Sequence, residues 1–347
     1  MVGCVAVALL PLLAVFRQAS CLQLPFFVDV GMPGFASSPA TLCPKSRLPH
    51  DQYERCEHTQ GVMQAFHEGS TLGLEECQRQ FSQRRWNCTT AYRSSFETAI
   101  SKATRETAFV FAMTVAGIIY SVSRECALGD LRECGCDRSW IKKTHQYGDW
   151  FWGGCGDNIE YGVEFSRNFI LARTPDKDLA RENMDKHNVI AGGKITQDSA
   201  VMECQCHGFS GSCTVKSCWK QLPSMSKIGL LVKREFDGAV KVTLNDADRE
   251  LIPENPRHIP PTDSNLVYLT KSSDYCKYDP STGSHGTIGR ECNKTSDGID
   301  GCSLMCCNRG FYSREVTLTR RCKCQFIWCC HVKCETCKER VIKHFCN

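Results

Sequence analysis

Two long apolar runs stand out along the 347-residue chain, and the first lies at its N-terminus. Residues Val2–Phe16 are apolar and uncharged, and Arg17 and the small residues Ala19-Ser20-Cys21 follow them. A run of this length is too short to cross a bilayer core of about 30 Å comfortably, but it suits the apolar region of a secretion signal. We expect residues 1–21 to be a signal peptide that is cleaved near Cys21 or Leu22; a retained membrane anchor is the alternative.

The second apolar run is Ala108–Val122, which has an Arg-Glu pair close to each end. It is shorter than the roughly 18 residues expected of a membrane span, so a helix buried in a protein core is favoured. Ser94 and Glu97 have the spacing of a capping box. The pattern therefore predicts one helix from Ser94 to Cys126.

Two further segments of the N-terminal part are predicted to be helical. They are His58–Phe81 and Asp157–Ile170, and in the second Ile159, Val163 and Ile170 share one helix face. These helices give this part of the chain enough apolar surface for a substantial core. Residues 246–272 contain several prolines, which predict a linker or an extended connection.

The 26 cysteines change this picture. A reducing cytosol would not sustain so many as disulfides, so the chain is either a secreted, cross-linked protein or an intracellular protein with many metal sites. Without residues 1–21 there are 24 cysteines, an even number that permits complete pairing. Two N-x-T sequons, at Asn87 and Asn293, are predicted glycosylation sites. We expect an exported glycoprotein of the extracellular space and matrix, associated with the cell surface.

Cysteine density divides the chain into two parts. Twelve cysteines lie between residues 22 and 275, and twelve more lie from Cys276 to the end, where disulfides must replace much of the apolar core. The expected fold is α+β and disulfide-rich. It comprises a helical N-terminal domain (22–245) with a projecting hairpin (204–218), the linker (246–272), and a small, cysteine-dense β-hairpin domain (273–347).

The charge distribution bears on the partners. A net charge of +4 is too small to favour a nucleic acid. From Cys276 onward there are twelve Lys and Arg against seven Asp and Glu. A basic secreted module of this kind suits a sulfated polysaccharide such as heparan sulfate, although solvated hairpin faces explain the same charges equally well.

The segment 204–218 carries the most informative chemistry. Cysteines two apart on a strand point to the same side, and the glycine-containing stretch between them can return the chain, so Cys204–Cys218 and Cys206–Cys213 are expected as nested disulfides. In the loop-entropy model these closures contribute roughly 3 and 2.5 kcal/mol. They would hold Ser210 at a rigid tip. Ser210 is then a small residue in a structural turn, a hydrolase nucleophile, or an acceptor for a modifying enzyme.

A serine hydrolase is the least favoured of these alternatives. A nucleophile elbow needs G-x-S-x-G, and Ser212 occupies the last position of that motif. His207 lies only three residues before Ser210, inside a closed ring, and has no evident carboxylate to orient it.

The segment CHGFSGSCTVKSCW (206–219) closely resembles the signature of the Wnt family of secreted signalling proteins. The resemblance extends over nearly all of the mature chain, through EECQRQFSQRRWNC (75–88), RETAF (105–109), WGGCGD (152–157), GRECN (289–293), CSLMCCNRG (302–310) and CKCQFIWCC (322–330). One departure is HNVIAGG (187–193), where many members have HNNEAGR.

The resemblance implies a non-catalytic ligand that carries a mono-unsaturated C16 acyl ester on Ser210. Porcupine would add the acyl group, and Wntless would carry the protein during export. The acyl chain and the flanking Phe209 would bind the cysteine-rich domain of Frizzled. The ligand would thereby bring Frizzled together with a lipoprotein-receptor-related co-receptor. A second Frizzled contact is implied at the tip of the C-terminal hairpin, near residues 326–332: Phe326, Trp328, Cys329, Cys330 and Val332. The alternative to this contact is that Phe326 and Trp328 pack inward. The alternative to a ligand is a structural matrix protein, whose function would not depend on these two residues.

The resemblance implies no cofactor beyond the acyl group and N-glycans, and no metal. Zinc is the rival for Cys322-x-Cys324 and Cys334-x-x-Cys337, but an oxidising compartment favours the disulfides Cys322–Cys337 and Cys324–Cys334. A Cys329–Cys330 bond is also expected, although it would be strained because Cα atoms across a trans peptide lie about 3.8 Å apart. The other implied pairs are Cys43–Cys56, Cys77–Cys88, Cys126–Cys134, Cys136–Cys155, Cys276–Cys307, Cys292–Cys302 and Cys306–Cys346.

Overall fold

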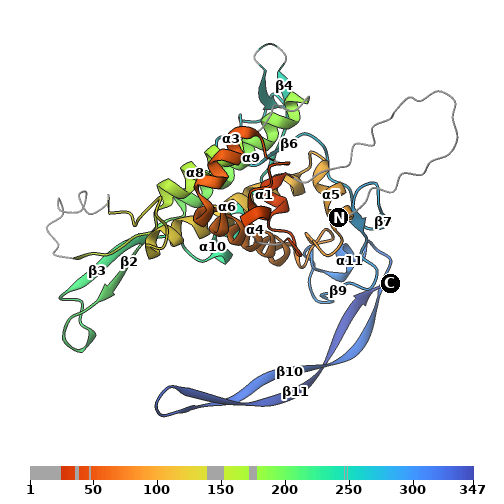
Figure 1. The fold of residues 1–347 in the computed structure, drawn as a ribbon. Coiled ribbons are helices and arrows are strands. Elements are labelled where there is room, and N and C mark those ends of the chain that lie inside the picture. The colour runs from red at the N-terminus through yellow and green to blue at the C-terminus, as the bar shows by residue number, and fades with distance from the viewer. Residues whose placement is uncertain are drawn as a thin grey trace.

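The structure is a computed structural model that describes residues 25–35, 39–46, 48–138, 152–171, 178–245, 247 and 249–347. The expected signal peptide, with its cleavage site, lies outside these residues. In Figure 1 a body of helices carries two long hairpins and a small sheet. The helices are α1 (Phe26–Asp29), α2 (Pro39–Leu42), α3 (His50–His58), α4 (Gln60–Phe81), α5 (Arg93–Ser101), α6 (Arg105–Leu128), α8 (Ile159–Leu171), α9 (Leu179–Asp198), α10 (Met225–Asp237) and α11 (Cys302–Met305).

Helix α6 is the centre of the helical body. It packs against α4, α8, α9 and α10, because its apolar side chains surround the helix rather than forming one stripe. Its most apolar 18-residue window has a mean hydropathy of 1.5, which would suit a membrane span, yet 94% of that window is buried inside the protein. The prediction of a core helix over Ala108–Val122 is therefore confirmed.

The prediction of one helix from Ser94 to Cys126 is wrong in its extent. The chain leaves the helical conformation at Lys102 and resumes it after Thr104. The Arg181 side chain of α9 donates hydrogen bonds to the carbonyl oxygens of Ile100 and Ser101, at 2.9 and 2.6 Å, and so satisfies the end of α5. Ser94 is not the N-cap of α5, because it lies inside the helix and Tyr92 holds that position.

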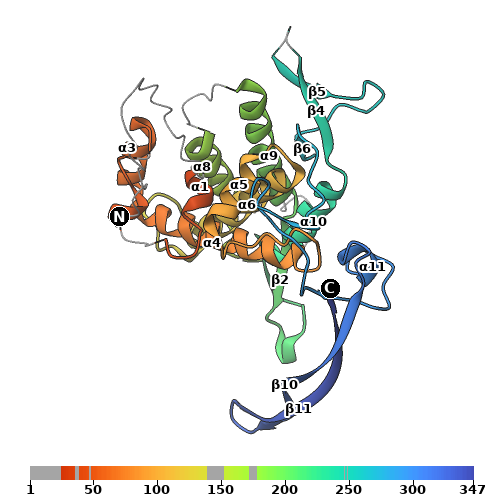
Figure 2. The same cartoon turned by 90° about the vertical axis from the view of Figure 1, so that its right-hand side faces the viewer.

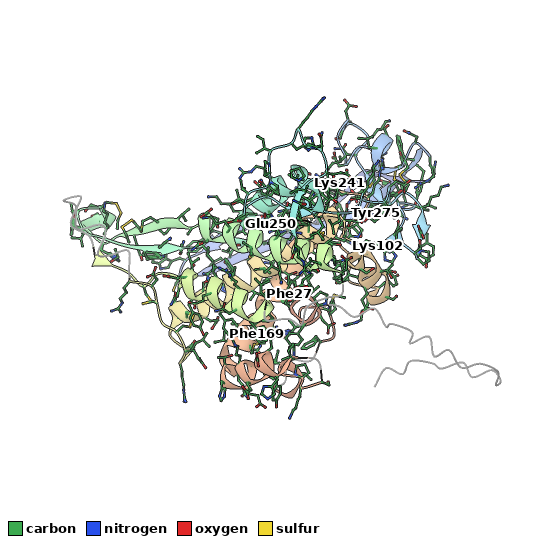
Figure 3. The ribbon with its side chains drawn as sticks, turned by 90° about the horizontal axis from the view of Figure 1, so that it is seen from above. Phe27, Lys102, Phe169, Lys241, Glu250 and Tyr275 are labelled. Carbon is green, nitrogen blue, oxygen red and sulfur yellow. A yellow bond between two sulfur atoms is a disulfide. The ribbon has the colours of Figure 1, made fainter. Side chains whose placement is uncertain are left out.

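The other helix predictions hold with shifted ends. The segment predicted as His58–Phe81 divides at Thr59 into the end of α3 and the whole of α4, and the one predicted as Asp157–Ile170 is α8. Helices α9 and α10 were not predicted. Figure 3 shows this body from above and labels Phe27 of α1 and Phe169 of α8.

Three small sheets project from the helices or follow them. One has the order β1-β3-β2, with β1 (Trp152–Gly153), β2 (Val201–Cys206) and β3 (Lys216–Gln221). A second has the order β5-β4-β6, with β4 (Val240–Asn245), β5 (Glu250–Pro253) and β6 (Val267–Tyr268). The third has the order β10-β11-β9, with β9 (Glu291–Cys292), β10 (Phe311–Ile327) and β11 (His331–Cys346). A separate pair joins β7 (Tyr278–Asp279) and β8 (Ser284–His285).

Residues 246–272, for which a linker or an extended connection is predicted, include strands β5 and β6 of the second sheet. Strand β5 pairs antiparallel with β4, and β6 pairs parallel with β4. The buried side-chain amide of Asn188 hydrogen-bonds both the N–H and the carbonyl oxygen of Val267, each at 3.0 Å. A side chain of α9 thus takes the place of a neighbouring strand and holds β6 on the helical body.

The two parts of the molecule have different cores. One large apolar cluster runs through the helical part, with Phe66, Phe109, Phe111 and Ile118 among its fully buried members. The C-terminal cluster consists of Cys292, Cys302, Met305, Cys306 and Cys346, with Phe311 packed against it. Disulfides therefore supply most of the C-terminal interior, as the cysteine density predicts.

Candidate functional site

The two hairpins carry the sequence-predicted site residues. Figures 1 and 2 show the β2–β3 hairpin and the β10–β11 hairpin projecting from the same side of the helical body. Each ends in a short loop with large exposed side chains.

The base of the β2–β3 hairpin is fixed to the start of α8. The buried carboxylate of Asp157 accepts a hydrogen bond from the N–H of Leu222 at 2.8 Å, and the N–H of Asp157 donates to the carbonyl oxygen of Lys220 at 2.9 Å. Burial raises the pKa of Asp157, while the hydrogen bond from Leu222 opposes that rise. Asp157 ends the WGGCGD segment and begins the helix predicted over Asp157–Ile170, but the sequence pattern does not predict its bonds to the hairpin.

Two cross-strand disulfides stiffen this hairpin. Cys204 and Cys218 are direct partners in the β2–β3 ladder and are bonded, with Cα atoms 4.1 Å apart. Cys206 is bonded to Cys213, with Cα atoms 4.5 Å apart. Both pairs are the ones that the spacing predicts. The ladder ends at Cys206 and Lys216, so the second disulfide closes the loop beyond it.

The loop places Ser210 at the outermost turn. A single 3₁₀ turn, Phe209–Gly211, is closed by hydrogen bonds from Gly211 N–H to the Gly208 carbonyl at 2.9 Å and from Ser212 N–H to the Phe209 carbonyl at 3.1 Å. Ser210 has φ 56° and ψ 28°, a left-handed conformation that costs an L-residue about 1–2 kcal/mol. The disulfide-closed loop holds this conformation, in which Ser210 is exposed to solvent.

Phe209 beside Ser210 is 94% exposed, the most exposed large apolar side chain of the described residues. Among those residues, no side chain hydrogen-bonds the Ser210 hydroxyl, and no carboxylate hydrogen-bonds the ring of His207. The described geometry therefore lacks the base and the orienting acid of a hydrolase triad. It presents a hydroxyl and an apolar ring together.

The β10–β11 hairpin is long, and a bulge and two disulfides interrupt it near its tip. Its register shifts between Cys322 and Gln325, and Lys323 has a positive φ there. Cys322 is bonded to Cys337 and Cys324 to Cys334, the pairs expected in place of zinc. Beyond them Phe326 lies opposite Val332 in the ladder, and the turn starts at Trp328.

The tip of this hairpin is apolar and open to solvent. Trp328 is 90% exposed, Phe326 67% and Val332 61%, so these side chains do not pack inward. Ile327, 46% exposed, belongs to the same tip, although sequence analysis did not select it. A concentration of exposed apolar side chains on a stiff hairpin indicates a surface that a partner covers.

The expected Cys329–Cys330 disulfide is absent from the structure. Both cysteines are exposed free thiols, and their sulfur atoms lie 3.2 Å apart, too far for a bond. The peptide between them is trans, and trans neighbours have Cα atoms closer together than ordinary disulfides allow. The two residues have positive φ values, 57° and 85°, and form the turn itself.

The remaining implied disulfides are present with the expected partners: Cys43–Cys56, Cys77–Cys88, Cys126–Cys134, Cys136–Cys155, Cys276–Cys307, Cys292–Cys302 and Cys306–Cys346. The sulfurs of Cys292, Cys306 and Cys346 lie within 4.8 Å of one another. Each belongs to a disulfide and offers no thiolate, so this cluster does not provide a metal site.

The two sequons differ in exposure. Asn293 is exposed, and its Oδ1 accepts hydrogen bonds from the N–H and the hydroxyl of Thr295 at 3.1 and 2.9 Å. Asn87 is half-buried and lies between Trp86 and Cys88, which are both buried. The side chain of Asn293 is therefore the more accessible of the two.

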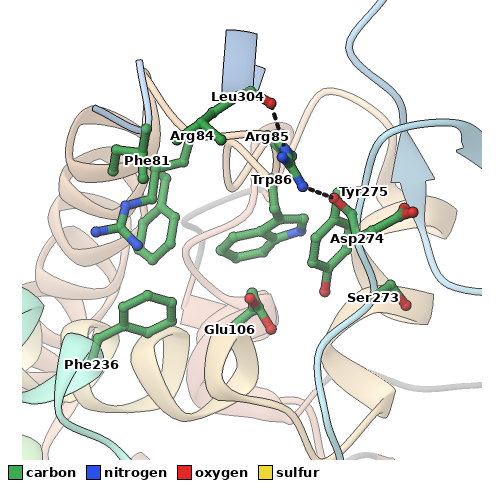
Figure 4. A pocket seen from close by; sticks show the side chains of 11 residues that line it. Phe81, Arg84, Arg85, Trp86, Glu106, Phe236, Ser273, Asp274, Tyr275 and Leu304 are labelled. Carbon is green, nitrogen blue, oxygen red and sulfur yellow. Dashed lines mark hydrogen bonds between the residues drawn. The ribbon is translucent and has the colours of Figure 1, made fainter. Parts of the chain in front are cut away.

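A pocket of about 320 Å³ lies where the helical part meets the C-terminal part (Figure 4). Aromatic rings of Phe81, Trp86, Phe236 and Tyr275 line it, and the buried carboxylate of Glu106 faces it. Glu106 accepts a hydrogen bond from the Ser272 hydroxyl at 2.7 Å, and burial together with Glu106 raises the pKa of Tyr275. Because groups of this same protein already interact with these polar side chains, we assign the pocket no ligand.

Comparison with known proteins supplies the family. The model of the wnt family matches residues 45–347. Protein Wnt-5a of Pleurodeles waltl is 43% identical over 333 residues, which cover 94% of this chain and 90% of that protein. Protein Wnt-5a of Homo sapiens is 44% identical over 308 residues, covering 86% and 80%. The solved structure described as human WLS in complex with WNT8A is similar with a TM-score of 0.63 and 32% identity, covering 90% of this chain and 100% of that chain.

Proposed function

The chain belongs to the Wnt family of signalling ligands, and on that premise we propose that it binds the cysteine-rich domain of Frizzled through both hairpin tips. An acyl chain on Ser210 makes the first contact, and Phe326, Trp328 and Val332 make the second. Members of this family are ligands rather than enzymes, so the hydrolase alternative is set aside.

The observation that carries this proposal is the geometry at Ser210. A doubly cross-linked loop presents the exposed hydroxyl of Ser210 in a left-handed conformation, beside a phenylalanine that nothing in the described protein covers. Burying a C16 chain at about 0.8 kcal/mol per CH₂ yields on the order of 10 kcal/mol before ordering costs. No side chain of this loop approaches that amount, so a lipid ester is the element best able to dominate binding.

The rest of the complex follows from the family. We propose Porcupine as the acyltransferase, Wntless as the export carrier and a lipoprotein-receptor-related protein as co-receptor. The similarity to the WLS–WNT8A complex supports the carrier. We propose that heparan sulfate binds the C-terminal hairpin, because this hairpin has exposed cationic side chains: Arg314, Arg321, Lys333 and Lys338. N-glycans are proposed on Asn87 and Asn293.

Replacing the acceptor hydroxyl tests the first contact. The Ser210→Ala variant should carry no acyl group, be exported poorly and fail to activate receptor-bearing cells, because the ester cannot form. Intact-mass analysis of the secreted protein and a reporter assay measure this. Ser212→Ala, two residues away, is the matched control and should keep the acyl mass. Full signalling by unacylated Ser210→Ala would refute the proposal.

The Trp328→Ala variant tests the second contact. Loss of an exposed tryptophan anchor should weaken binding to the Frizzled domain by roughly 10-fold or more, as expected of a central interface residue. Biolayer interferometry on the acylated protein measures this. Ile342→Ala, on the same hairpin and also exposed, is the control and should bind normally. A structural matrix role predicts equal affinity for all three proteins.

A further inference from the structure

None of the eleven disulfides among the described residues joins the helical part to the C-terminal part. Cys276 and all later bonded cysteines pair among themselves, and the earlier ones do the same. Each hairpin is thus stiffened locally, yet no cross-link fixes one hairpin relative to the other. The orientation of one hairpin relative to the other must therefore be set by non-covalent contacts where the helical part meets the C-terminal part, a boundary that we call the seam.

Arg290 of the C-terminal part crosses this seam to the end of α4. Its guanidinium donates hydrogen bonds to the carbonyl oxygens of Ser82 at 3.0 Å, Arg84 at 2.8 Å and Arg85 at 2.7 Å. Ser82 is the residue that follows the last helical position, Phe81. The carbonyls at a helix C-terminus lack partners within the helix and carry partial negative charge, so a cation there is favourable.

Arg85 crosses the seam in the opposite direction. Figure 4 shows its guanidinium reaching two backbone carbonyls of the C-terminal part, Leu304 at 3.0 Å and Asp274 at 3.4 Å. Leu304 belongs to α11 in the disulfide-rich core, and Asp274 lies on the chain that enters this part. The two arginines therefore bind reciprocally, since Arg290 also holds the backbone of Arg85 itself.

We propose that Arg85 and Arg290 are positioning residues that fix the direction of the β10–β11 hairpin relative to the β2–β3 hairpin. The inference rests on the proposed function, because it matters only if both tips bind one receptor. Two contacts on one rigid body act as linked sites, and the second forms at high effective concentration only when its geometry is set in advance. A planar guanidinium can hold several carbonyls at fixed angles, whereas a lysine ammonium acts as a single point charge.

The test is a double-mutant cycle with full-length, acylated protein and the Frizzled cysteine-rich domain. Arg290→Lys should weaken binding by about 10-fold, because the tip of the β10–β11 hairpin is no longer held in a fixed direction relative to the β2–β3 hairpin. In a Trp328→Ala background the same change should weaken binding by less than about 2-fold, since there is no second contact left to position. Arg85→Lys should reproduce this non-additivity, and Arg167→Lys, exposed on α8, is the control.

Amide hydrogen exchange provides a readout that does not use the receptor. Arg290→Lys should speed exchange in residues 82–86 and around α11, with little change in α6. An equal loss of affinity on both backgrounds, or no loss with intact Trp328, would overturn the positioning role. If Trp328→Ala alone leaves affinity unchanged, the two-contact function fails instead, and the positioning role falls with it.

Discussion

Lys233 is an unusual residue in the interior of the helical body. It lies on α10, is only 9% exposed, and its Nζ has no hydrogen-bond partner among the described residues. The ammonium lies 3.6 Å from the ring centroid of Phe81, 4.6 Å from that of Phe236 and 5.9 Å from that of Phe109. The pKa of Lys233 is lowered to about 7, chiefly by burial and in addition by the charge of Arg84, while Asp237 and Glu106 oppose the shift.

This residue predicts a pH dependence of stability. The unfolded lysine keeps a pKa of 10.5 and the folded one has a pKa of about 7, so between these values unfolding takes up a proton. The free energy of unfolding should therefore rise from pH 7 towards pH 10, by up to about 1.4 kcal/mol per pH unit. Lys233→Met, which keeps the apolar stem, should remove this rise. Thermal unfolding of both proteins at pH 7 and pH 9 measures it, and identical slopes would contradict it.

At the scale of elements, glycines set the distance between α4 and α6. A Cβ at Gly117 of α6 would meet the carbonyl oxygen of Gly69 and would lie 2.7 Å from the N atom of Gly73, both in α4. These neighbours are backbone atoms, which cannot move aside as a side chain can. The two helices can approach this closely only because all three positions lack a side chain, and the packing of the whole body around α6 depends on it.

Gly117→Ala should therefore lower the free energy of unfolding by roughly 1–3 kcal/mol, the usual cost of overpacking a core. Gly193→Ala in α9 is a matched control, because it is also a buried helical glycine. Its added Cβ would meet only the Cδ1 atom of Ile119, at 3.6 Å, which is ordinary contact. That variant should unfold at the same temperature or slightly higher, since alanine favours helix. Calorimetry distinguishes the two, and equal effects would refute the close-packing argument.

At the scale of the whole molecule, the two parts are stabilised by different means. The helical part has a large apolar cluster, whereas the C-terminal cluster is built chiefly from cystines and Met305. A small domain of this kind has too little apolar burial to fold without cross-links. The direction of the β10–β11 hairpin therefore depends on a part that is sensitive to reduction.

Graded reduction should thus unfold the C-terminal part first. At low dithiothreitol, amides of β10, β11 and α11 should lose hydrogen-exchange protection while those of α4 and α6 keep it. Helical circular dichroism should change little over the same range. Binding through the second tip should be lost together with that protection. Simultaneous loss of protection in α6 and β11 would show that one core supports both parts.

Some site features were predictable because they are local. The nested cystines around Ser210 span only 14 and 7 residues, and the alternation of side chains on a strand dictates which cysteines meet. The Cys329–Cys330 expectation failed at this same scale, because a trans peptide in a turn of two positive φ residues holds the sulfurs apart. Helix α10 has Ile228, Val232 and Phe236 at helical spacing, a periodic signal that sequence analysis did not use.

The sequence by itself determined the core helix, the disulfide-closed serine loop and the cysteine-rich interior of the C-terminal part, because short-range apolar patterns and cysteine spacing encode them. Only the tertiary structure decided where the Ser94–Cys126 segment breaks, that β6 docks on α9, and how the two hairpins are oriented. These depend on hydrogen bonds between residues far apart in the chain, 79 positions for Asn188 and Val267 and 205 for Arg290 and Arg85. Such contacts produce no periodic pattern in the sequence. Each one requires a single polar side chain and a backbone carbonyl that come together only when the chain folds.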